Sequence, residues 1–146
     1  TTIGWLGCGV TSLATLINFY NSSVNSTIPR TDPGQLNGYL RTHNGYTPSN
    51  DVDFDIIEGY SNESVIYLGR YDVGELYSRT DLLVIADASI LYGNPIIFRI
   101  GGHFVLAVGK CGNSYVVAEP LGGIERLYNP DDLTDREFRG IRLFGF

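Results

Sequence analysis

The sequence predicts a single α+β domain in which N-terminal helices pack on a C-terminal antiparallel β-sheet. Apolar residues recur at helical spacing after Cys8, and a nearly continuous apolar run covers residues 81–92. From Pro95 onward, short β-branched runs alternate with glycine or asparagine turns, which is typical of strands. At 146 residues the chain has the size of one domain, so we assign residues 1–146 to a single unit.

The first predicted helix begins at Gly7-Cys8-Gly9, and its apolar side chains fall on one face. These are Val10, Leu13, Ala14, Ile17 and Tyr20. Their spacing predicts that the helix is anchored in a hydrophobic core. Residues 21–30 follow as a polar loop.

A second helix is predicted to begin at Asp32-Pro33, because aspartate is a favoured N-cap and proline suits the first helical position. It ends near His43, where a cation complements the helix dipole and Asn44 or Gly45 provides the cap. We therefore interpret His43 as a structural residue.

The middle of the chain carries weaker patterns. Residues 51–55 alternate in polarity and fit either a strand or the start of a helix, and 64–68 indicates a short strand. Residues 72–80 indicate one or two helical turns. The apolar run over 81–92 predicts a buried helix that ends at Gly93.

The C-terminal half predicts an antiparallel meander. Its strands are expected at 96–100, 103–108, 115–118, 124–128 and 140–144. Gly101-Gly102 separates the first two of these and predicts a tight hairpin, in which His103 starts the second strand.

Composition narrows the function classes. A net charge of −6 and a pI near 4.7 argue against nucleic-acid binding and favour cationic or neutral partners. No apolar run reaches the length of a membrane span, and the N-terminus lacks the basic region of a signal peptide, so no membrane partner is expected. A secreted, a virion-associated and a cytoplasmic location stay open, as does the oligomeric state.

Cys8 is the candidate nucleophile. A thiol at a helix N-terminus faces unpaired backbone N–H groups and the positive end of the helix dipole, both of which favour the reactive thiolate. The flanking Gly7 and Gly9 leave the sulfur approachable. The alternative is a small buried cysteine with no chemical role.

His103 is the candidate base, and Glu119 is the candidate residue that orients its imidazole. His103 starts one predicted strand and Glu119 ends the next, so both lie at the same edge of an antiparallel sheet. Separately, His103 fits a satisfied core histidine and Glu119 a charge at a strand end. In the order Cys, His, acid they fit a nucleophile, its base and an orienting group.

The stretch Gly7-Cys8-Gly9-Val10-Thr11-Ser12-Leu13-Ala14 resembles the signature of papain-like cysteine peptidases related to the bacteriocin-leader (double-glycine) processing enzymes. Further similar segments follow in the same order as in bacterial and phage members of that family. They are Asp32 to Leu40, Asn44-Gly45-Tyr46, Gly93-Asn94-Pro95-Ile96-Ile97, His103 to Gly109, and Tyr115 to Pro120. The resemblance covers nearly the whole chain.

This resemblance implies a papain-like fold and a hydrolase in which Cys8, His103 and Glu119 form the catalytic triad, acting on a peptide or cell-wall peptide. Glu119 stands where the family usually has aspartate. The family's oxyanion-hole glutamine precedes the cysteine, whereas the single glutamine here, Gln35, follows it. A donor from Thr2, the Trp5 indole or a backbone amide would then assist the Cys8 N–H.

Several alternatives accompany this interpretation. An inert papain-like module used for binding or structure is the main one, and acyl transfer to an amine in place of water is another. Cys111, in a predicted turn, is expected to be a reduced thiol, although a disulfide with Cys8 would end any thiol chemistry. Neither histidine has partners at metal-ligand spacing, so we expect no metal and no cofactor.

Overall fold

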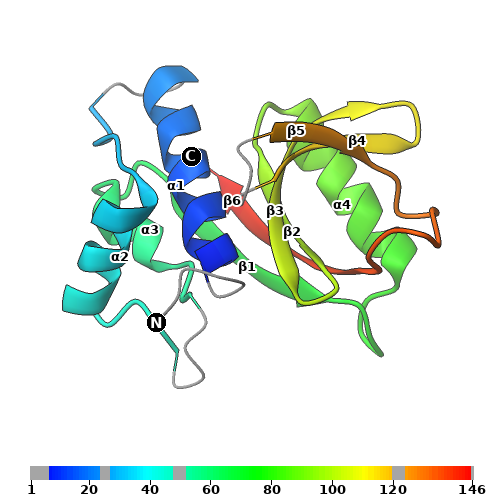
Figure 1. Ribbon diagram of the computed structural model, residues 1–146, viewed down its shortest axis with the longest axis horizontal. Helices are drawn as coiled ribbons and strands as arrows, with labels where there is room; N and C mark the ends of the chain where they lie inside the picture. The colour runs from blue at the N-terminus through cyan, green and yellow to red at the C-terminus, as the bar shows by residue number, and fades with distance from the viewer. Residues whose placement is uncertain (1–6, 24–26, 48–51, 120–123, 146) are drawn as a thin grey trace.

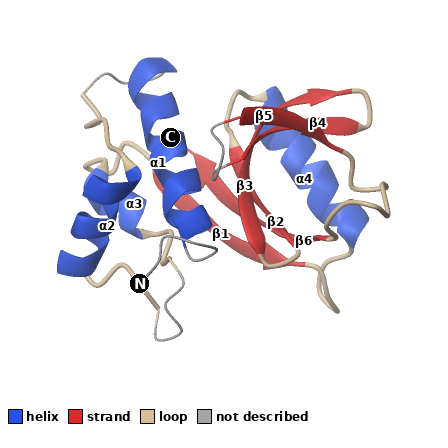
Figure 2. Ribbon diagram, viewed as in Figure 1, coloured by secondary structure: helices blue, strands red, loops and turns tan. Residues whose placement is uncertain are grey.

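A computed structural model describes residues 7–23, 27–47, 52–119 and 124–145, with the side chains of Gly7, Cys8, Ser23 and Glu119 excepted. It is an α+β fold, as predicted (Figures 1 and 2). In chain order the elements are α1 (Gly7–Ser23), α2 (Pro33–Thr42), α3 (Ile56–Tyr60), β1 (Ile66–Asp72), α4 (Arg79–Leu91), β2 (Ile96–Ile100), β3 (His103–Cys111), β4 (Ser114–Glu119), β5 (Ile124–Tyr128) and β6 (Phe138–Gly145).

The strands form one antiparallel sheet in the order β1-β6-β2-β3-β4-β5. Successive residues of the central strands point to opposite faces and enter two separate cores. Ile97 and Leu106 lie in the core shared with α1, α2 and α3, whereas Phe98 and Val105 lie in the core shared with α4. The sheet is therefore covered by α1 on one face and by α4 on the other (Figure 2).

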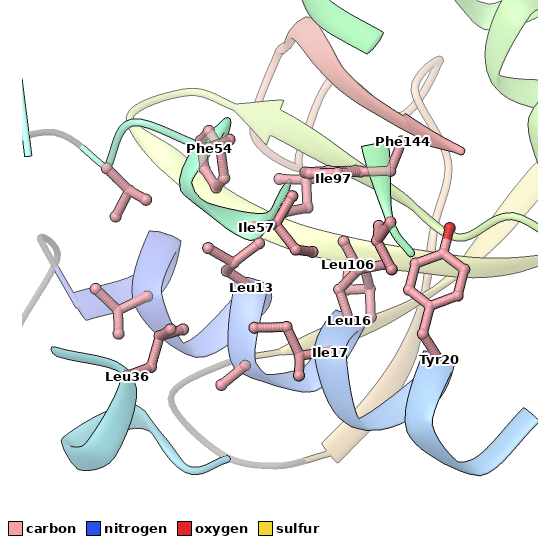
Figure 3. Packing of buried hydrophobic residues seen from close by; sticks show 14 of the residues in the cluster. Leu13, Leu16, Ile17, Tyr20, Leu36, Phe54, Ile57, Ile97, Leu106 and Phe144 are labelled. Atoms are coloured by element: carbon pink, nitrogen blue, oxygen red, sulfur yellow. The ribbon is translucent and has the colours of Figure 1, made fainter. Parts of the chain in front are cut away.

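Helix α1 is anchored as the sequence predicts. The five apolar residues predicted to anchor it are all buried. Figure 3 shows Leu13 and Leu16 on the side of α1 that faces the sheet residues Ile97 and Leu106. This packing fixes α1 against the centre of the sheet.

The predicted helix ends of α2 and α4 are confirmed. The carboxylate of Asp32 accepts a hydrogen bond from the Gln35 N–H at 2.8 Å, and Pro33 occupies the first turn of α2. Asn44 follows α2 with a φ of 55°, the left-handed conformation of a helix C-cap. Gly93 adopts a φ of 84° after α4. Local chemistry thus sets these boundaries.

The predicted meander is correct for β2 to β5 and wrong for β6. Strand β6 does not pair with β5 but returns to lie between β1 and β2. Its residues Phe138, Ile141 and Phe144 are buried, as expected for a central strand, whereas β5 is largely exposed and forms an edge. The nine residues 129–137 between β5 and β6 give the chain enough length to cross the sheet.

Two local predictions also need correction or completion. The prediction of helical turns over 72–80 is wrong, because Asp72 ends β1 and α4 begins only at Arg79. Ser78 and Asp81 form a capping box at the start of α4. Of the ambiguous segment 51–55, residues 52–55 are described and lead into the short helix α3. Among the described helices, none is both long and apolar enough to cross a membrane.

Candidate active site

The fold places the three predicted catalytic residues at the ends of neighbouring elements. Cys8 lies in the first turn of α1, His103 is the first residue of β3, and Glu119 is the last residue of β4. The backbone positions of all three are described, whereas the side chains of Cys8 and Glu119 lie outside the described part of the structure.

The start of α1 lies against the start of β3. The buried hydroxyl of Ser12, one turn after Cys8, donates a hydrogen bond to the Phe104 carbonyl at 3.3 Å. A Cβ atom placed on Gly9 would lie 3.6 Å from the Phe104 ring and 3.3 Å from Val52. Since Gly9 follows Cys8 and Phe104 follows His103, the two candidate residues are each next to a residue at this close approach of α1 and β3.

His103 is only 6% exposed and belongs to the predicted hairpin. It pairs with Ile100 across Gly101-Gly102, and the turn requires a φ of 58° at Gly101, which glycine readily adopts. Because residues paired across a hairpin share a face, position 103 lies on the face of Ile100, toward α4, whereas Phe104 packs toward α1. The His103 ring could therefore reach the thiol position of Cys8 only around the end of β3.

Position 119 shares both the edge and the face of position 103. Ala118 pairs with Leu106 in the core under α1, and Val117 pairs with Ala107 in the core under α4. Strand alternation then assigns position 119 to the face of Val117. Positions 103 and 119 thus lie on the same face at the same end of the sheet.

An ion pair between the buried Arg142 and the partly exposed Asp72 lies beside Phe104. The Arg142 guanidinium is centred 5.4 Å from the Phe104 ring and donates through Nη1 to Asp72 Oδ1 at 3.1 Å. Asp72 also accepts from Arg70 Nε at 2.7 Å. Burial alone raises the pKa of the Asp72 carboxyl, but the hydrogen bond from Arg70 and the charge of Arg142 outweigh this and hold its pKa below the usual value.

Sequence reasoning missed Arg142 and Phe104 as parts of this region. Arg142 stands between apolar residues in a strand that is buried along most of its length. A charged residue within such an apolar run could have indicated a buried ion pair, because buried charges in proteins are paired. Burial lowers the pKa of the Arg142 guanidinium, and the charge of Asp72 opposes that effect.

Aromatic side chains pack around Phe104, and acidic side chains lie near the neighbouring Tyr67. The Phe54 ring packs edge-on against Phe104, with ring centres 5.5 Å apart, and lies near Tyr67. Burial is the main reason that the pKa of Tyr67 rises to about 12. The pKa of Asp55 is raised by partial burial, by a hydrogen bond with Asp53 and by the charges of Asp53 and Glu58.

The remaining candidate residues either lie outside the described residues or lie away from the start of β3. Thr2 and Trp5, considered as oxyanion donors, lie outside the described residues. Cys111 ends β3 as a free, exposed thiol. His43 caps α2, where its ring stacks on Tyr39 with centres 3.8 Å apart. In the part of the chain that the structure describes, no three His, Cys, Asp or Glu residues are grouped to hold a metal ion.

Comparison of the chain with protein-family models, with curated proteins and with solved structures gives no match.

Proposed function

We propose that this protein is a papain-like cysteine peptidase in which Cys8 attacks a peptide or isopeptide carbonyl, His103 transfers the proton and Glu119 orients the imidazole. The observation that carries the proposal is the hydrogen bond from Ser12 to the Phe104 carbonyl, because it ties the helix that begins at the thiol to the strand that begins at the imidazole. These two elements lie far apart in the sequence.

The chemistry balances without a further reactant besides water. The Cys8 thiolate adds to the carbonyl carbon, and the tetrahedral intermediate expels the amine, which takes a proton from the His103 imidazolium and leaves a thioester. His103 then removes a proton from water, whose oxygen attacks the thioester and releases a carboxylic acid and the thiolate. The Cys8 backbone N–H supplies one oxyanion donor.

A rigid support favours this chemistry. Effective nucleophilic catalysis needs the reacting groups held within about 0.5 Å of their productive positions. The buried apolar face of α1 and the central position of β3 in the sheet provide such a support. The site therefore rests on regular elements whose mutual position is fixed by a core.

The substrate class follows from charge and from the resemblance. A net charge of −6 favours neutral or cationic peptides over acidic ones. Peptide cross-links of the cell wall, which carry amide and isopeptide bonds, are the substrates that we propose to examine first. Product masses distinguish hydrolysis from transfer to an amine.

Alkylation of the thiol tests the proposal. The parent for all measurements carries Cys111→Ser, because the exposed Cys111 also reacts with iodoacetamide. An ordinary thiol with a pKa near 8.5 reacts roughly 200-fold more slowly at pH 6 than at pH 9, since only its thiolate is nucleophilic. An imidazole-paired Cys8 is expected to retain most of its rate at pH 6.

Single-residue variants identify which groups make Cys8 react fast at pH 6. We expect His103→Ala to remove the fast reaction at pH 6, Glu119→Gln to reduce it, and His43→Ala, on the exposed end of α2, to leave it unchanged. A Cys8 that alkylates with an ordinary pH profile in the folded parent contradicts the peptidase and supports the inert binding module.

A further inference from the structure

Arg142 is a buried charge that the proposed reaction does not use. Within the described residues it is the only buried side chain among the arginines, lysines, aspartates and glutamates, with 3% exposure. Buried ion pairs contribute little net stability, because desolvation offsets most of their attraction, and apolar replacements of the whole pair are often neutral. Stability therefore explains poorly why an arginine occupies this central strand.

The guanidinium contacts the residue that follows the proposed base. Three of the contacts of Phe104 concern its carbonyl and its ring: Ser12 donates to the carbonyl, the Phe54 ring packs on the edge of the Phe104 ring, and Arg142 lies over that ring. The first two contacts come from the helical side of the molecule. Arg142 adds the only one of the three that comes from within the sheet.

Asp72 fixes the direction of the guanidinium. It accepts from Arg142 Nη1, while the same Nη1 also donates to the Ile141 carbonyl at 3.0 Å. Arg70 holds the other carboxylate oxygen of Asp72. The ring of Phe104 thus rests on a chain of charge-assisted hydrogen bonds that spans β1 and β6.

We propose that Arg142 is a positioning residue: through Phe104 it holds the first residues of β3, and hence His103, against the start of α1. This inference rests on the proposed peptidase function. Without Arg142 one face of the Phe104 ring loses its support, and a small displacement at the start of β3 changes the distance from imidazole to thiol. A displacement of about 1 Å is enough to cost roughly 100-fold in rate.

Substitutions separate positioning from folding. Arg142→Met keeps the length and apolar stem of the side chain, and Asp72 retains Arg70 as its partner, so the variant is expected to fold. Arg142→Lys keeps a cation over the ring without the planar fork. Arg79→Met is the control, since it removes a comparable but exposed ion pair with Asp131.

Two readouts are needed, both in the Cys111→Ser parent. The first is the rate of Cys8 alkylation by iodoacetamide at pH 6. We expect this rate to fall by about 10-fold to 100-fold in Arg142→Met, to recover partly in Arg142→Lys and to stay unchanged in Arg79→Met. The second is hydrogen exchange of the amides of residues 103–105, expected to accelerate in Arg142→Met while the urea midpoint stays close to that of the parent.

The outcomes discriminate between the two proposals. An Arg142→Met protein with parental exchange at 103–105 and parental alkylation overturns the positioning role. Exchange at 103–105 could accelerate in Arg142→Met while Cys8 of the parent alkylates with an ordinary pH profile. That result shows that the peptidase proposal has failed, and the contact between Arg142 and Phe104 then has no catalytic role. A lysine variant as impaired as the methionine variant contradicts the part assigned to the positive charge.

Discussion

The Ser12 hydroxyl and the Phe104 carbonyl are joined by a hydrogen bond of 3.3 Å across 92 positions of sequence. Ser12 lies one helical turn beyond Cys8, and Phe104 follows His103, so this bond lies close to both proposed reacting positions. It predicts that local changes here alter thiol reactivity more than they alter overall stability.

Ser12→Ala leaves the Phe104 carbonyl without this donor. We expect a loss of about 1 kcal/mol in the free energy of unfolding, typical of one hydrogen bond, and a fall in Cys8 alkylation at pH 6. Ser89→Ala is the matched control, because Ser89 donates to the Asn94 carbonyl at 2.9 Å between α4 and β2. Urea denaturation and alkylation rates check both. Equal alkylation in the two variants would show that the Ser12 bond is only structural.

Two helical glycines give a second matched pair. A side chain on Gly9 would enter the space between Val52 and Phe104, whereas a Cβ on Gly38 in α2 meets nothing within 4 Å. Gly38→Ala is expected to add about 0.5–1 kcal/mol of stability and leave alkylation unchanged. Gly9→Leu is expected to cost about 1–3 kcal/mol and to slow alkylation, because it forces α1 away from β3. Thermal melts and alkylation rates test the contrast.

Asp55 is expected to destabilise the native protein at neutral pH. Its raised native pKa means that the folded state binds this proton more tightly than the unfolded state does, so stability decreases as the pH rises through the native pKa. Asp55→Asn should therefore increase the free energy of unfolding at pH 7. The gain should shrink as the solution is acidified toward pH 3.8. Urea melts across this range are the check, and a constant gain would contradict the assigned cause.

Asp72 is expected to affect the pH dependence of stability in the opposite direction to Asp55. Its native pKa lies below 3.8, so it stabilises the fold above the unfolded pKa, and this contribution is lost as the pH falls through the lower, native value. Asp72→Asn is expected to cost about 1–3 kcal/mol at pH 7, because Arg142 loses its charged partner. The difference from the parent should narrow in strong acid. Denaturation at pH 7 and pH 3 measures it.

Local chemistry made much of the fold predictable. The Asp32 cap, the glycine after α4 and the Gly101-Gly102 hairpin each depend on neighbouring residues alone, and all three stand where the sequence places them. The partner of β6 was not predictable in this way. Strand polarity indicates burial, but it does not identify which buried neighbours a strand selects after a connection of nine residues.

The same distinction between local and long-range information applies to the candidate site. Cys8, His103 and Glu119 could be proposed from their order and from the ends of their elements, because antiparallel strands bring such ends together. Phe104 and Arg142 could not, since their contact depends on β6 lying beside β2 and on β1 closing the sheet. Long-range pairing therefore determines the surroundings of the site, whereas local pattern determines its candidate reacting groups.

The distance between Cys8 Sγ and the nearer ring nitrogen of His103 in a crystal structure tests the central claim most directly. We predict a separation of no more than about 4 Å, with the imidazole reaching the thiol around the end of β3. A separation beyond hydrogen-bond reach, with the β3 backbone between the imidazole and the Cys8 sulfur, would contradict the peptidase.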